Sequence, residues 1–341
     1  MFKPEEIFDA LLNRAADRET MRLFGDMGEK ENRAALQEKL CGRPFSQLFL
    51  EFPLAGTAGF DLHVILDSKD IRQGVPFPAD IYGSHGQLFS WFGGKDRGKD
   101  GLDVVYDLRD GMDTPPMVYL KTRKNETELI DGFFAHAGAA EAAMRFREKR
   151  ALLPAGWDTW YTGVHTGRKG KPLRIGSFLS NALKERYAKN IGLFEETIAA
   201  VGFPSPLSHA LGDKLRELFR FPFEIDIQLD VMEDGSIGDT LGISLLTGSS
   251  GRNALAESFA SGAARDVMLL LEEWGVADDR WQHIPAATYQ VAATVRSADG
   301  DKRRFVLTSH LAFLKVRFRG TGALAHDAKA YLNLQHKEAF Q

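Results

Sequence analysis

The sequence has only one cysteine, Cys41, among its 341 residues. It can therefore form neither an internal disulfide nor a zinc site built on several cysteines. Long apolar runs are also missing, because no stretch of about 18 residues is apolar enough to cross a membrane as a helix. Residues 1–19 are acidic and amphipathic, unlike a secretory leader. These absences predict a cytoplasmic protein without a membrane partner, monomeric or weakly associating.

An excess of positive charge is missing as well. The 43 Lys and Arg residues are outnumbered by 47 Asp and Glu, which gives a formal net charge of −4. A chain with this balance has no general attraction for nucleic acid, so no nucleic-acid partner is expected. Any anion-binding site must be a local one. The 44% of hydrophobic residues supplies a sizeable core.

Several well-known catalytic motifs are absent. The sequence contains no phosphate-binding G-x-x-x-x-G-K-[ST], no dinucleotide fingerprint, no G-x-S-x-G nucleophile elbow, and no histidine spacing typical of a metal site. "GSSGR" at 248–252 could hold a phosphate at a helix start, although a plain strand-to-helix turn explains it better. "DDRWQ" at 278–282 fits the start of a further helix, expected over about 279–296. No metal site is predicted.

What is present is a repeated alternation of apolar and polar residues around turns. Five such stretches predict β-hairpins, because each has period-two patterning on both sides of a Gly-, Asp- or Pro-rich turn. They span residues 45–67, 103–123, 157–179, 223–248 and 310–336.

Helical patterns lie between most of these hairpins. They cover residues 1–40 (two helices), 125–153, 180–220 and 252–275. Residues 68–102 are rich in Gly, Asp and Pro and predict a long loop or a poorly formed helix. The αββ unit recurs at a spacing of roughly 55–70 residues, which favours one architecture over two domains. We therefore expect an α+β protein whose residues 1–341 form a single domain, with the N-terminal helices at 1–40 and the hairpins over 45–341.

Ten antiparallel strands in one sheet would leave long exposed edges unless the sheet closed on itself. Closure gives a barrel of about ten strands with the helices outside and a lumen inside. The alternative is an open sheet with helices on one face and solvent on the other. The barrel better explains why Tyr, Lys and Arg recur together on one parity of separate strands. These residues are Tyr119 and Lys121, Arg174, Lys315 and Arg317, and Lys329 and Tyr331.

The stretches "MVYLKTR", "PLRIGSF", "FLKVRF" and "AKAYL" resemble strands of the ABBA aromatic prenyltransferases, whose ten-stranded barrel encloses the active site. "LFLEFPL" resembles the first strand of that family, on which indole-prenylating members often carry a glutamate. The likeness covers most of the chain in architecture and is weak in motif. It implies transfer of a prenyl group from an allylic diphosphate to an aromatic or peptide acceptor, as in the tailoring of natural products. It requires no cofactor and leaves assistance by Mg²⁺ open.

The resemblance also implies roles for individual residues. Glu51 would be the catalytic base, and Tyr119 and Tyr331 would shield the allylic cation. The diphosphate would be held by Lys121, Arg174, Lys315, Arg317 and Lys329. Lys329 is expected among like-charged neighbours, so that its removal would cost little stability.

Each assignment has a structural alternative. The lysines could face solvent, the tyrosines could be ordinary sheet residues, and Arg174 and Glu51 could belong to internal ion pairs. The chain as a whole could be a barrel without catalysis that binds a peptide or an anionic metabolite.

Overall fold

A computed structural model describes residues 47–339 apart from short gaps at 58, 69–70, 72–84, 96–100, 108–114, 123–125, 166, 168–169, 171, 205, 248–251, 297–299 and 320–324. Its strands all belong to one antiparallel sheet. They are β1 (Gln47–Pro53), β2 (Asp61–Leu66), β3 (Leu102–Tyr106), β4 (Met117–Lys121), β5 (Trp157–Val164), β6 (Leu173–Leu179), β7 (Glu224–Val231), β8 (Ile237–Leu246), β9 (Tyr289–Arg296), β10 (Lys302–Arg319) and β11 (Ala325–Glu338).

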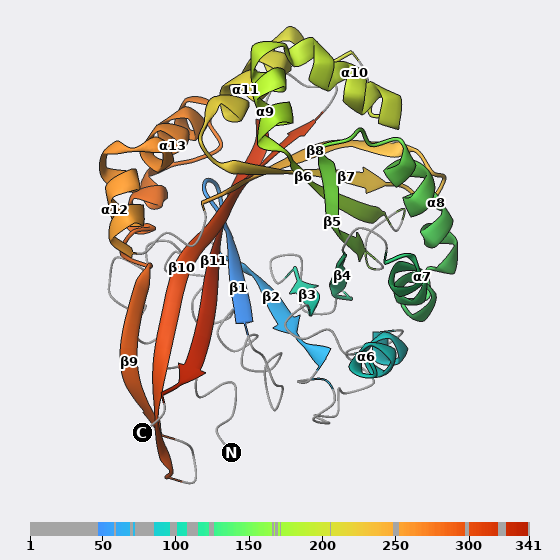
Figure 1. Cartoon of the computed structure of the whole chain (residues 1–341). Coiled ribbons are helices and arrows are strands. Elements are labelled where there is room, and N and C mark those ends of the chain that lie inside the picture. The colour runs from blue at the N-terminus through green and yellow to red at the C-terminus, as the bar shows by residue number, and fades with distance from the viewer. Residues whose placement is uncertain are drawn as a thin grey trace.

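The sheet closes into a barrel. Neighbouring strands follow chain order from β1 to β8, then β8 pairs with β10, β10 with β11, and β11 returns to β1. Figure 1 shows these ten strands around a common centre. Closure removes the open edges that a flat sheet of this size would expose. The predicted barrel and all five predicted hairpins are therefore confirmed, and the open sheet is not.

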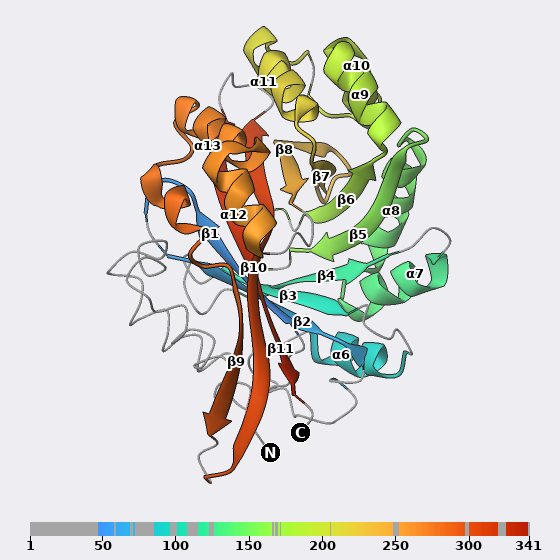
Figure 2. The same cartoon turned by 60° about the vertical axis from the view of Figure 1, so that its left-hand side comes forward.

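Strand β10 is the longest of the described strands, and it pairs with β11 along one edge and with two different strands along the other. Its second half, from Phe313 to Arg319, pairs with β8, and its first half, from Lys302 to Ser309, pairs with β9. The lower part of β10 leaves the barrel together with β9 and the end of β11 (Figure 2). The helix predicted over 279–296 is wrong. A short 3₁₀ turn, η2 (Asp279–His283), is followed there by β9.

Eight α-helices are described, and they lie around the outside of the barrel (Figure 1). Two predicted helices are each divided in two, at Gly138 and at Gly262. One helix, α6, lies within the predicted loop 68–102. The helices are α6 (His85–Gly93), α7 (Thr127–His136), α8 (Ala140–Ala151), α9 (Asn181–Lys189), α10 (Ile191–Val201), α11 (His209–Arg220), α12 (Arg252–Ser261) and α13 (Ala263–Glu273).

The hydrophobic core lies between the helices and the outer face of the barrel. In β7, Ile225, Ile227 and Leu229 are buried in this core, while Asp226 and Gln228 alternate with them and face inward to a cavity. Apolar burial is the main stabilising contribution to folding, so this alternation fixes which face of each strand turns inward. The predicted N-terminal helices at 1–40 and most of "GSSGR" lie outside the described residues. No helix in the described ranges is long and apolar enough to cross a membrane.

Candidate active site

The inward-facing side chains of the barrel surround a cavity that opens to solvent. The space inside it, with the open solvent at its mouth included, is about 1010 Å³. All eight residues proposed from the sequence line this one cavity: Glu51, Tyr119, Lys121, Arg174, Lys315, Arg317, Lys329 and Tyr331. The structure thus brings the whole predicted set together, while the role of each residue stays a prediction.

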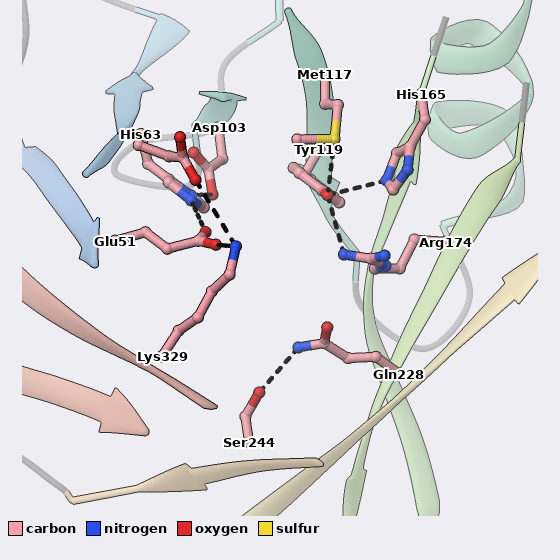
Figure 3. A network of polar contacts seen from close by, with 11 residues as sticks. Glu51, His63, Asp103, Met117, Tyr119, His165, Arg174, Gln228, Ser244 and Lys329 are labelled. Carbon is pink, nitrogen blue, oxygen red and sulfur yellow. Dashed lines mark hydrogen bonds and ion pairs between the residues drawn. The ribbon is translucent and has the colours of Figure 1, made fainter. Parts of the chain in front are cut away.

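Glu51 is the centre of an ion-paired cluster on one wall. Its Oε1 accepts from the ammonium of Lys329, and its Oε2 lies 2.8 Å from Nε2 of His63 (Figure 3). Nδ1 of His63 is 3.2 Å from Oδ2 of Asp103, and Lys329 also approaches Asp61 at 3.7 Å. These groups come from β1, β2, β3 and β11, which are neighbours in the barrel.

The charges of this cluster hold one another in place. Burial lowers the pKa of His63, but Asp103 and Glu51 outweigh it and raise that pKa to about 10. His63 is therefore a cation at neutral pH, and both of its ring nitrogens donate. Burial raises the pKa of Glu51, but Lys329 and His63 outweigh it and hold that pKa well below its usual value. Glu51 is a carboxylate over the whole neutral range.

A second cluster lies on the opposite wall. Arg174 binds Asp230 through two parallel hydrogen bonds, Nε to Oδ1 at 2.8 Å and one terminal nitrogen to Oδ2 at 2.9 Å. Its other terminal nitrogen donates to the hydroxyl of Tyr119 at 3.3 Å, and that hydroxyl lies 2.9 Å from Nε2 of His165 (Figure 3). A bidentate arginine–carboxylate pair fixes the guanidinium plane. Arg174 and Tyr119 are therefore held in position before any ligand binds.

The remaining cations of the cavity differ in whether a carboxylate binds them. Arg317 makes a bidentate pair with Asp327, whereas Lys315, which is only 7% exposed, has neither a hydrogen bond nor an ion pair with any described residue. Lys329 lies opposite the like-charged Lys315, as expected, but Glu51 also binds it directly. Arg174, Arg317 and Lys329 are thus paired already, and the alternative of internal ion pairs holds for Arg174 and Glu51.

A third group of polar side chains was missed by the sequence analysis. Both oxygens of Asp226 accept hydrogen bonds: one from the indole of Trp160 at 2.9 Å, the other from Gln228 at 2.9 Å and Tyr161 at 3.4 Å. Gln228 also donates to Ser244 at 2.9 Å. Burial raises the pKa of Asp226 to about 6 in spite of these donors. The alternation of polar and apolar residues in β7 predicts that Asp226 and Gln228 share one face of the strand, but it does not predict which side chains they bind.

Aromatic rings form much of the rest of the wall. Phe313 stacks on Tyr331 with ring centroids 4.0 Å apart, and His63 meets the edge of Tyr331 at 5.5 Å. Tyr119 and Tyr161 meet edge to face at 5.8 Å. Burial raises the pKa of both Tyr161 and Tyr331, so their hydroxyls stay neutral donors. Such ring faces attract a cation by about 0.5–2 kcal/mol each.

Two glycines leave room for these rings. Gly176 pairs directly with Tyr161, and Gly163 pairs directly with Tyr119. A methyl group on Gly176 would lie 1.9 Å from the Tyr161 ring, and one on Gly163 would lie 2.1 Å from the Tyr119 ring. Both tyrosines therefore lie flat across the strand beside them. This arrangement keeps the rings against the wall and leaves the middle of the barrel open.

Among the residues that the structure describes, no group of three or more His, Cys, Asp or Glu side chains is arranged to hold a metal ion. The carboxylates nearest the cavity cations are engaged with those cations, as the pairs of Glu51, Asp230 and Asp327 show.

Comparison with known proteins gives similarity in structure alone. No protein-family model matches the chain, and no curated protein does. The crystal structure of the apo form of the prenyltransferase PriB matches with a TM-score of 0.52 and 14% identity, over 97% of this chain and 94% of that one. PriB in a ternary complex with L-tryptophan and dimethylallyl thiolodiphosphate matches with a TM-score of 0.50, 14% identity and the same coverage.

A third solved structure, AnaPT from Neosartorya fischeri, has a TM-score of 0.44 and 11% identity over 98% of this chain and 91% of that chain. The matches to PriB span almost the whole of both chains, so the resemblance to the ABBA prenyltransferases is confirmed for the fold.

Proposed function

We propose that the protein transfers a prenyl group from an allylic diphosphate to an aromatic or peptide acceptor inside the barrel. One observation carries the proposal: five Lys and Arg side chains and several aromatic rings converge on one cavity of a fold shared with PriB. A diphosphate needs cations and an allylic cation needs aromatic faces, so one enclosed site that offers both suits this chemistry. The complex of PriB with a dimethylallyl thiolodiphosphate and tryptophan supports the same pairing of ligands.

In the proposed reaction, the bond between the allylic carbon and the diphosphate oxygen breaks, and both electrons leave with the diphosphate. Lys315 is the first group that we expect to bind it, as the ammonium that forms when the diphosphate enters, because Lys315 has no ion pair to break. Arg174 and Arg317 keep N–H groups beyond those that bind Asp230 and Asp327. Lys121 and Lys329 complete the set. Groups fixed on barrel strands need little reorganisation, which is a large source of catalysis.

Tyr119 and Tyr331 would face the allylic cation, joined by Trp160, Tyr161 and Phe313, which line the same cavity. The acceptor would then attack the allylic carbon and form the new bond. Its surplus proton would go to Glu51, which is ionised. A carboxylate with a low pKa is a weak base. It suffices here because a protonated aromatic ring is a far stronger acid than any carboxylic acid.

The direct test is product formation. The protein is incubated with dimethylallyl, geranyl or farnesyl diphosphate and a panel of aromatic acceptors that includes tryptophan, and prenylated product is detected by mass spectrometry. We expect product with at least one pair and a strong loss of rate in Lys315→Gln. Lys302→Gln is the matched control, since Lys302 lies on the same strand and is exposed. Its rate should equal that of the wild type.

The alternative without catalysis keeps the same cavity and differs in outcome. A binding protein for a peptide or an anionic metabolite would show ligand-dependent stabilisation and no prenylated product. Stabilisation by inorganic diphosphate but not by any prenyl diphosphate would favour this alternative. The apolar part of the cavity would then bind no prenyl chain.

A further inference from the structure

Lys315 stands apart from the other cations of the barrel. Of the described cations that line the cavity, it is the one for which no hydrogen bond or ion pair is found. The residue as a whole is only 7% exposed. Buried charges are normally paired, and an unpaired buried lysine tends to lose its proton instead.

The surroundings of Lys315 favour the neutral amine. Lys315 lies opposite Ser244 on β8 and Lys329 on β11. Burial lowers its pKa most, Arg174 lowers it further, Glu51 opposes this, and Arg317 and Lys329 add to the lowering. The result is a pKa well below the ordinary value of 10.5. Other charged groups line the same cavity: His63, Asp103, Asp107, Lys121 and Asp226. Asp230 and Asp327 are also close enough for Lys315 to lower their pKa values.

Three features thus coincide at one atom: an amine that is buried yet open to a cavity, no ion pair with a described residue, and three cations near enough to lower its pKa. An unprotonated lysine in such a place is a nucleophile. The cations around it would bind an anionic substituent on whatever reaches it. Gly242 has no side chain to cover the amine, and a methyl group there would already touch Cε of Lys315 at 3.4 Å.

We propose that Lys315 is a covalent attachment site for aldehydes that carry a phosphate or carboxylate group. The lone pair of the amine adds to the carbonyl carbon and gives a carbinolamine, which loses its hydroxyl as water and leaves an imine. One amine and one aldehyde are consumed and one water is released, without any oxidant or reductant. Arg174, Arg317 and Lys329 hold the anionic group. The proposal does not depend on prenyl transfer, and it concerns the cavity before any diphosphate occupies it.

The test uses pyridoxal 5′-phosphate as the anionic aldehyde and borohydride to convert the imine to a stable amine. Peptide mapping by mass spectrometry then gives the extent of labelling at each lysine near pH 7. We expect Lys315 to be labelled before Lys121 and before the exposed Lys302, since each unit by which its pKa is lowered raises the neutral fraction about tenfold. Labelling spread evenly over exposed lysines, or greater at Lys121 than at Lys315, would overturn the proposal.

Three controls sharpen the outcome. Pyridoxal lacks the phosphate, and its aldehyde is partly masked as a cyclic hemiacetal, so its labelling is compared between two lysines of the same sample. Its preference for Lys315 over Lys302 should be smaller than that of pyridoxal 5′-phosphate, and an equal preference would contradict the role of the cations. Inorganic diphosphate should protect Lys315, because it occupies the cations and favours the protonated amine. Undiminished labelling would show that the aldehyde does not use the cations that bind diphosphate, which would contradict the proposal. The variant Lys315→Arg keeps a long basic side chain but has no nucleophilic amine, so it should lose the adduct. Mapping of the wild type decides the question even if this variant does not fold.

Discussion

Lys329 and Glu51 are separated by 278 positions in the chain and meet in the barrel as a buried ion pair. Removing one partner of such a pair costs about 3–5 kcal/mol, because the other charge stays buried without compensation. Lys329→Ala should therefore lower the free energy of unfolding by about 3 kcal/mol, the lower end of that range, since His63 still faces Glu51. If Lys329 also binds diphosphate, that affinity should fall about ten- to a hundredfold.

Urea unfolding and a titration with geranyl diphosphate measure the two effects separately. Lys337→Ala is the matched control, because Lys337 lies on the same strand and is exposed. It should change neither quantity by more than about 0.5 kcal/mol. A Lys329→Ala protein as stable as the wild type would contradict the ion pair.

His63 makes stability depend on pH. Its pKa rises from 6.5 in the unfolded chain to about 10 in the folded one, so the folded protein holds this proton more tightly. The stabilisation is complete below about pH 6.5 and is lost as the pH rises through about 10. It amounts to about 5 kcal/mol at most, by conversion of a shift of this size at about 1.4 kcal/mol per pKa unit.

The test compares wild type with His63→Gln by urea unfolding from pH 6 to pH 10. The wild type should be the more stable protein at pH 6, and the difference should shrink steadily toward pH 10. A constant difference across this range would show that His63 is not held as a cation by Glu51 and Asp103.

At the scale of single residues, the sequence predicted which side chains face the lumen but not how they are paired. The parity of Lys315, Lys329 and Tyr331 follows from period-two alternation, which needs only local sequence. The partners of Lys329 and Arg174 come from strands distant in the chain. Their identity depends on the register across the closed barrel, and no local pattern contains that register.

Strand β5 shows how an element's irregularity shapes the site. Thr159 pairs with Ser177 and Tyr161 with Gly176, so Trp160 is an extra residue in the ladder. A bulge of this kind breaks the alternation. Trp160 and Tyr161 are neighbours in the chain, yet both line the cavity. Period-two alternation places only one of these two residues inside the barrel, so the sequence pattern does not predict that both line the cavity.

The local sequence of β9 predicts a helix, but tertiary pairing makes it a strand. Its alanines favour a helix, yet its exposure alternates at period two, with Tyr289 and Val295 buried and Gln290 and Arg296 exposed. Pairing with the first half of β10 decides in favour of the strand. That half of β10 precedes the predicted hairpin at 310–336, so the partner that stabilises β9 had not been recognised.

The packing of Tyr161 on Gly176 gives a test at the level of paired strands. Gly176→Ala should lower the free energy of unfolding by about 1–3 kcal/mol, because the new methyl group displaces a ring in a packed wall. In a Tyr161→Ala background the same change should be neutral or stabilising by about 0.5–1 kcal/mol, as alanine for glycine in a strand normally is.

A double-mutant cycle from chemical unfolding measures this coupling. Gly86→Ala in α6 is the control, since a methyl group there meets nothing within 4 Å. Equal effects of Gly176→Ala in both backgrounds would show that the ring does not rest on the glycine.

At the scale of the whole molecule, the sequence predicted the barrel because ten strands with one apolar and one polar face have few other stable arrangements. Closure through β11 brings the first hairpin and the last hairpin together. Glu51 and Lys329 therefore share one wall, and the cavity depends on every strand from β1 to β11 except β9. The side chains that line the cavity decide which ligand the barrel binds, so the proposed function depends on them.

The most direct test of that proposal is a calorimetric titration of the protein with geranyl diphosphate, alongside Lys315→Gln and Lys302→Gln and with geraniol as the ligand that lacks the diphosphate. The account predicts binding by the wild type and by Lys302→Gln. In Lys315→Gln the affinity should be about ten- to a hundredfold weaker, the loss expected for one charge-assisted contact. Geraniol should bind far more weakly than its diphosphate. Equal affinities of wild type and Lys315→Gln, or no binding by any of the three proteins, would contradict the claim that this cavity holds a prenyl diphosphate.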